Sequence, residues 1–137
     1  MSSGPTPRDA AEAAQAWADE WARAWPAADV EALCALYAPD ARFHSQSLRD
    51  HESPRSYVKR VFAEQSRAEC RFGTPIVSGD RAAIDWWGVI EDRDGGLETV
   101  AGTSLLRFGA DGRVLEQRDA WGSAPGRVDA PHWAPRA

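Results

Sequence analysis

The sequence predicts an α+β domain, a cone-shaped α+β barrel in which three N-terminal helices pack on a strongly curved antiparallel sheet. Two observations carry this prediction. Segments with helical hydrophobic periodicity occupy the first half of the chain, and three long strand-like runs occupy residues 81–122. Helices that cover one face of such a sheet enclose an interior. We therefore expect a single core with a cavity inside it.

Residues 80–122 are predicted to form an antiparallel meander. The first run, residues 81–91, is too apolar and too rich in β-formers for an exposed segment, which indicates a central strand. Asp-Gly-Gly at residues 94–96 and Asp-Gly at residues 111–112 contain residues that adopt positive φ at little cost, so each is a natural hairpin turn.

The first helix is predicted to start at Thr6, an N-cap followed by Pro7, and to run to Trp25, where Pro26 stops it. Its apolar residues recur at three- and four-residue spacing, so they form a stripe that faces the sheet. The stripe consists of Ala10, Ala14, Trp17, Trp21 and Trp25.

Two shorter helices are expected next. Asp29 caps the first, whose helical period continues to Tyr37 before Pro39 closes it, and residues 41–45 form a short strand. The second starts at the N-cap Ser53 and covers residues 55–66. Residues 70–77 then form one strand, at an edge or a bulge because Pro75 lacks a backbone donor.

Length and charge limit the function. The 137 residues suffice for one domain, and the net charge is -5 with scattered basic residues, which argues against a nucleic-acid partner. We found neither an 18-residue apolar run nor a secretory leader, so a cytoplasmic protein without a membrane partner is expected. Residues 1–7 are expected to be a disordered leader, residues 8–122 the domain and residues 123–137 an irregular tail. Trp133 could pin this tail, which either closes the pocket or hangs free.

Cofactors and metals are not expected. Cys34 and Cys70 lie in apolar settings without CxxC spacing, which favours core thiols over a bridge. His44, His51 and His132 show no ligand spacing. Glycine-rich phosphate loops and nucleophile elbows are missing as well, which argues against nucleotide cofactors and covalent catalysis.

Side-chain alternation selects the candidate catalytic groups. Asp119 and Trp121 share one face of the last strand, and Asp85 shares a face of the central strand with Trp87 and Val89. If both faces point inward, Asp85 and Asp119 meet in one aromatic-lined cavity. Their pKa values would rise there, and they could divide acid and base roles. The alternative is that Asp119 points outward or pairs with a neighbouring arginine, Arg107 or Arg118.

Three segments carry a family resemblance. They are DVEALCALYAPDARF at residues 29–43, GTSLLRF at residues 102–108 and DGRVLEQRDAW at residues 111–121. Over about residues 8–122 the chain resembles the nuclear transport factor 2-like superfamily, and within it the SnoaL-like polyketide cyclase group. The resemblance implies that Asp119 matches the acid or base of those cyclases, and that the protein forms a homodimer.

Two other branches of the superfamily match less well. In the steroid isomerase branch Trp121 matches a pocket aromatic, but the general base falls at Ser45, the oxyanion-hole aspartate at Ser104 and the tyrosine at Trp21. The mechanism of that branch is therefore not expected.

The limonene-epoxide hydrolase branch places its two aspartates at Asp85 and Asp119. Its arginine falls near Ala83 and its water-holding pair at Phe43 and Ser45. Epoxide hydrolysis would thus need a different set of supporting residues, although the hydroxyl of Ser45 could still hold a water.

The leading hypothesis is a small-molecule-binding protein that acts on an apolar substrate by cofactor-independent acid/base chemistry, as an isomerase, cyclase or hydrolase. Asp119 and Asp85 are the catalytic candidates. The candidate substrate-binding residues are Trp17, Trp21, Phe43, Ser45, Tyr57, Trp87, Val89, Ser104, Gln117 and Trp121. The alternative is a non-catalytic ligand-binding or homodimerisation module with Trp86 on its outward face.

Overall fold

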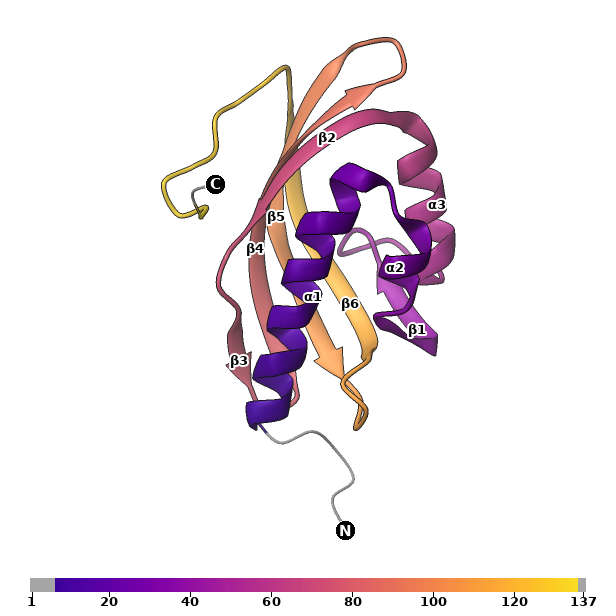
Figure 1. Cartoon of the computed structure of the whole chain (residues 1–137), viewed down its shortest axis with the longest axis vertical. Helices are drawn as coiled ribbons and strands as arrows, with labels where there is room; N and C mark the ends of the chain where they lie inside the picture. The colour runs from indigo at the N-terminus through magenta and orange to yellow at the C-terminus, as the bar shows by residue number, and fades with distance from the viewer. Residues whose placement is uncertain (1–6, 136–137) are drawn as a thin grey trace.

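Three helices cover one face of a strongly curled sheet in the computed structural model, which describes residues 7–135 (Figure 1). The predicted cap at Thr6 and the leader before it lie outside the described residues. The helices are α1 (Pro7–Ala27), α2 (Val30–Cys34) and α3 (Pro54–Glu64). The strands are β1 (Tyr37–His44), β2 (Gln65–Phe72), β3 (Ile76–Ser78), β4 (Arg81–Asp92), β5 (Leu97–Phe108) and β6 (Val114–Pro125). The predicted α+β cone is confirmed.

The sheet has the order β1-β6-β5-β4-β2, and β3 pairs with β4 beside β2. The predicted meander is confirmed, because β4, β5 and β6 pair antiparallel in sequence order. The sheet is nevertheless mixed rather than antiparallel, since β1 runs parallel to β6. Hairpin signals fix only strands that a short turn connects, whereas β1 and β6 are far apart in the chain.

Helix α1 presents its predicted stripe to the core, where all five of its residues are buried. The helix ends at Ala27 and contains Pro26, two residues beyond the predicted stop. Ala28 then adopts a φ of 53°, a left-handed conformation that ends the helix.

Helix α2 is shorter than predicted. The Asp29 cap is confirmed, since its side chain accepts from Ala32 N at 3.1 Å. The chain becomes extended at Tyr37, and Pro39 lies inside β1 instead of closing a helix. Proline is tolerated there because β1 is an edge strand whose register with β6 shifts between Tyr37 and Arg42.

Helix α3 starts as predicted, with the Ser53 hydroxyl accepting from Ser56 N at 3.1 Å. It ends at Glu64 and the chain continues directly into β2, five residues before the predicted strand. The segment around Gly73 and Pro75 divides the predicted strand into β2 and β3, which both pair with β4.

Strand β6 continues to Pro125, four residues past the predicted end at Trp121. The following residues fold over the outer face of the sheet, away from the helices (Figure 1). Trp87 Nε1 donates to Val128 O at 3.0 Å, and Ala134 packs against Trp87 and Val89. Trp133, the predicted pin, is 41% exposed, so Trp87 holds the tail instead. Within residues 7–135 no helix has the length and apolarity that a membrane span requires.

Candidate active site

The helices and the concave face of the sheet surround a cavity of about 550 Å³. Its volume lies in the range of small-molecule sites. The residues that line it come from α1, the loop before α3, α3 itself and β2, β4, β5 and β6. Those that the following argument uses are Trp17, Trp21, Trp25, Ser45, Arg49, Tyr57, Arg60, Gln65, Trp86, Ser104, Gln117, Asp119 and Trp121.

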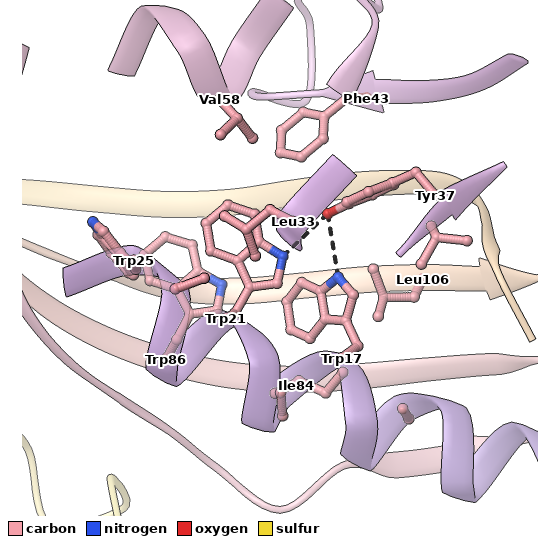
Figure 2. Close-up of a cluster of buried hydrophobic side chains, with 14 of the residues drawn as sticks. Trp17, Trp21, Trp25, Leu33, Tyr37, Phe43, Val58, Ile84, Trp86 and Leu106 are labelled. Atoms are coloured by element: carbon pink, nitrogen blue, oxygen red, sulfur yellow. Dashed lines mark hydrogen bonds between the residues drawn. The ribbon is translucent and has the colours of Figure 1, made fainter. Parts of the chain in front are cut away.

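Indole rings form one wall of the cavity (Figure 2). Trp21 meets Trp25 edge to face at a centroid distance of 6.2 Å, and Trp25 meets Trp86 at the same distance. Gln65 fixes the end of this row, because it accepts from Trp25 Nε1 at 3.2 Å and donates to Trp25 O at 2.9 Å. These ring contacts and hydrogen bonds make the wall apolar and hold its rings in place.

Asp119 enters the cavity from the middle of β6. Its strand partner is Ser104 on β5, and both side chains lie on the concave face. Ser104 Oγ donates to Asp119 Oδ1 at 2.7 Å, and Gln117 Nε2 donates to the same oxygen at 3.0 Å. Asp119 is only 6% exposed.

A hydrogen-bond relay fixes the orientation of Gln117. Tyr37 Oη accepts from Trp17 Nε1 and Trp21 Nε1, both at 3.2 Å (Figure 2). A hydroxyl accepts two hydrogen bonds and donates one, so the Tyr37 proton goes to Gln117 Oε1. The amide NH₂ of Gln117 must then face Asp119.

Ser104 is oriented in the same way. Its hydroxyl accepts from Trp86 Nε1 at 2.9 Å and donates to Asp119. The indole N–H groups thus act indirectly: they orient Ser104 and, through Tyr37, Gln117. Each of these two residues donates one hydrogen bond to Asp119 Oδ1.

Burial raises the pKa of Asp119 to about 6, although the hydrogen bonds from Ser104 and Gln117 lower it. Both of these bonds end on Oδ1, and Oδ2 has no protein donor among the described residues. No buried side-chain oxygen in that part of the chain lacks a partner, so Oδ2 is accessible from the cavity. It is the atom that can exchange a proton with a ligand.

Tyr57 contributes a second polar group. Its ring stacks on Phe43 at a centroid distance of 4.2 Å, and Arg60 lies over it at 5.6 Å. Burial, followed by the negative charge of Asp119, raises the pKa of the phenol, which therefore stays neutral and can donate. No backbone group of residues 7–135 and no side chain of residues 10–135 hydrogen-bonds to this hydroxyl.

Eight of the predicted site residues line this cavity: Trp17, Trp21, Ser45, Tyr57, Ser104, Gln117, Asp119 and Trp121. Four others do not line it. Phe43 lies behind Tyr57 and is fully buried. Trp87 and Val89 face outward beneath the C-terminal tail.

Asp85 is the fourth, and its predicted place in the cavity is wrong. Ser104 pairs with both Asp119 and Ile84, so Ile84 shares the concave face and Asp85 takes the opposite one. There Asp85 is exposed and accepts from Thr103 Oγ1 at 2.7 Å.

The same inversion misplaced Trp86, which faces the cavity instead of the outside. On β6 a bulge changes the alternation. Phe108 pairs with Val114 but Arg107 pairs with Glu116, so Val114 joins the core together with Gln117 and Asp119.

Some residues of the candidate site were not found from the sequence. Tyr37 was assigned to a helix, and its role depends on contacts with residues up to 80 positions away. Trp25 was recognised only as part of the core stripe. Arg49 lies in a loop without a motif, and no sequence signal identifies it.

Comparisons with known proteins agree with this architecture. A SnoaL-like domain model matches residues 18–117, well over half of the chain. No protein with a curated description matches the sequence.

Solved structures are similar in fold. One is a protein from Novosphingobium aromaticivorans, provisionally assigned as an aromatic ring hydroxylase, with a TM-score of 0.70 and 20% identity over 88% of this chain and 95% of that one. Another is the epoxide hydrolase/cyclase-like enzyme SalBIII, which has a role in pyran ring formation in the polyether salinomycin. Its TM-score is 0.69, with 14% identity over 79% of this chain and 89% of the other.

A third is an NTF2-like protein of unknown function from Exiguobacterium sp. 255-15. It has a TM-score of 0.65 and 21% identity over 80% of this chain and 98% of that chain. At these identities the structures share the fold, while the family model covers most of the chain. The protein belongs to the SnoaL-like domain family of the NTF2-like superfamily.

Proposed function

We propose that the protein binds an apolar, ring-containing small molecule in the cavity and carries out cofactor-independent acid/base chemistry on it through Asp119. One observation carries the proposal: a buried carboxylate whose Oδ1 holds two protein donors while Oδ2 is accessible from the cavity. Oδ1 is thus the oxygen that the protein holds in place, and Oδ2 is the oxygen that would react.

Proton transfer would occur at Oδ2. A pKa of about 6 leaves Asp119 mostly ionised at pH 7 but more basic than an exposed carboxylate. The ionised form would remove a proton from a carbon next to a carbonyl group. Protonated Asp119 would then return the proton from Oδ2, the oxygen that holds no protein donor. Return of the proton to a different carbon completes an isomerisation. If the enolate carbon instead attacks a second carbonyl carbon of the same molecule, the new C–C bond closes a ring and the proton from Oδ2 goes to the resulting alkoxide oxygen, which completes a cyclisation.

The neutral phenol of Tyr57 would supply one hydrogen-bond donor to an oxygen of the substrate. Water attack with two aspartates is less well supported, since Asp85 lies on the other face of the sheet. The pyran-forming role of SalBIII agrees with a cyclase reading but is a property of that protein.

The test compares Asp119→Asn with the matched control Asp85→Asn. Asparagine retains an Oδ1 that accepts from Ser104 and Gln117, so the cavity should keep its shape and its ligand affinity. We expect turnover of an enolisable cyclic ketone to fall by a factor of about 10² or more in Asp119→Asn and to stay unchanged in Asp85→Asn. If wild type and both variants bind the ligand with equal affinity and wild type shows no turnover, the result would favour a non-catalytic binding module.

A homodimerisation module is the second candidate, and an exposed surface favours it. Leu105 and Ile76 are 40% and 73% exposed on the outer face, beside a groove of about 530 Å³. Sedimentation velocity on wild type and Leu105→Glu would test it, since a dimer through this face should dissociate in the variant. A monomer at all concentrations would exclude this function.

A further inference from the structure

Arg49 lies at the solvent side of the cavity with an unneutralised charge. It is exposed, lines the cavity, and its Nη1 donates to Ser45 Oγ at 3.3 Å. No carboxylate forms an ion pair with it among the side chains of residues 10–135. Glu52, a loop carboxylate whose charge interacts with Arg49, is held by Arg60 through two hydrogen bonds of 2.6 and 2.8 Å. Among the described residues Asp50, next to Arg49 in the sequence, forms no ion pair with it.

The loop that carries Arg49 is fixed at its base. Phe43 and Glu52 exchange two backbone hydrogen bonds of 2.9 Å. Trp121 Nε1 donates to Ser45 O at 2.6 Å, which attaches the start of the loop to β6. The backbone that carries Arg49 is therefore held beside the cavity, although the arginine side chain itself is long.

The phenol of Tyr57 lies within range of both charges. Burial raises its pKa most, the negative charges of Asp119 and Glu52 raise it further, and the positive charges of Arg60 and Arg49 lower it. Tyr57 and Arg49 thus offer a neutral donor and a cationic donor on one side of the cavity. Buried Asp119 offers an acceptor further inside.

We infer that Arg49 and Tyr57 bind a carboxylate group of the substrate, and that the substrate class is a carboxylate attached to an aromatic or polycyclic body. This inference rests on the proposed binding function of the cavity. A guanidinium forms paired, charge-assisted hydrogen bonds with a carboxylate, and the phenol adds a third donor. The apolar body then fills the tryptophan-lined interior, where Asp119 Oδ2 is accessible.

The experiment measures binding of two probes of the same shape, 2-naphthoate and the neutral 2-naphthamide, by isothermal titration calorimetry at pH 7.5. The variants are Arg49→Gln and the matched control Arg42→Gln, an exposed arginine on β1 that does not line the cavity. We expect wild type to prefer naphthoate by about 10-fold. Arg49→Gln should remove this preference while leaving the affinity for naphthamide unchanged, and Arg42→Gln should keep it.

Each other result has a definite meaning. Equal affinity of wild type for the two probes, or a preference that survives Arg49→Gln, overturns the carboxylate site but leaves the apolar cavity as a binding site. A loss of preference in Arg42→Gln as large as that in Arg49→Gln indicates general surface charge and also overturns it. If neither probe binds to wild type, the proposed binding function fails and the inference fails with it.

Discussion

Tyr37 determines which way Gln117 faces. The single phenol proton of Tyr37 is directed at Gln117 Oε1, because two indole N–H groups occupy its acceptor positions. The amide nitrogen of Gln117 is thereby turned toward Asp119. A residue at the start of an edge strand thus sets the hydrogen bonding of a carboxylate on the neighbouring strand.

Replacing Tyr37 by phenylalanine should be costly. The variant leaves the N–H groups of Trp17 and Trp21 and the Oε1 atom of Gln117 buried without a partner, so we expect a loss of about 3 kcal/mol in the free energy of unfolding. Tyr57→Phe is the control, because its hydroxyl has no protein partner among the described residues, and it should lose less than about 1 kcal/mol. Urea denaturation measures both, and equal losses would contradict the relay.

Asp119→Asn should become relatively more stable than wild type as pH rises. The folded-state pKa of Asp119 is raised, so the native protein binds more protons than the unfolded chain between about pH 4 and 6 and loses stability as pH rises through this window. The full destabilisation, about 3 kcal/mol, is present above pH 7 and absent below pH 4.

The variant lacks this titration. Between pH 5 and 8 the difference in unfolding free energy between Asp119→Asn and wild type should change by about 1 kcal/mol in favour of the variant. Denaturant titrations at several pH values measure this. A difference that is constant with pH would mean that Asp119 has an ordinary pKa.

Gly102→Ala should distort the cavity edge. Gly102 pairs with Trp121, and an added Cβ would lie 2.3 Å from Ala120 O and 2.6 Å from Trp121 Cβ. Because backbone atoms cannot move aside easily, we expect a loss of about 2 kcal/mol or more and weaker ligand binding. Gly122→Ala is the control, since its Cβ meets nothing within 4 Å and should change stability by less than about 0.5 kcal/mol. Equal effects would argue against the close approach of β5 and β6.

Deleting residues 126–137 should expose the outer face of β4. Trp87 would lose its hydrogen bond to Val128 O and its contact with Ala134. It would also lose the guanidinium of Arg127, which lies 5.5 Å from the centre of its ring. We expect a loss of about 2 kcal/mol in the free energy of unfolding and stronger acrylamide quenching of tryptophan fluorescence. Unchanged stability and quenching would mean that the tail does not cover Trp87 in solution.

Much of the fold could be predicted because its signals are local. The Asp29 and Ser53 caps, the α1 stripe and the two glycine turns each depend on a few adjacent residues, and each was found in the structure. The parallel pairing of β1 with β6 could not be predicted in the same way, since it joins segments that no short turn connects.

The site was predicted only in part, because the alternation of side chains along a strand does not reveal which of its two faces points inward. The pattern of β4 separates Asp85 from Trp86, but it does not say which of the two faces the helices. Both faces of β4 are apolar, since the tail covers one and α1 the other. For β6 the inward face was chosen correctly, so Asp119 was placed in the cavity. For β4 the outward face was taken as the inward one, so Asp85 was placed in the cavity by mistake.

The most direct test of the account is the pKa of Asp119 itself, measured by a carboxyl-carbon NMR titration of protein with labelled aspartate. Asp119→Asn identifies its signal. We predict one carboxyl group with a midpoint near pH 6, missing from the variant, because burial disfavours the ionised form. A midpoint near 4 or below for the Asp119 signal would contradict the account, since the carboxylate would then be too weak a base for the proposed chemistry.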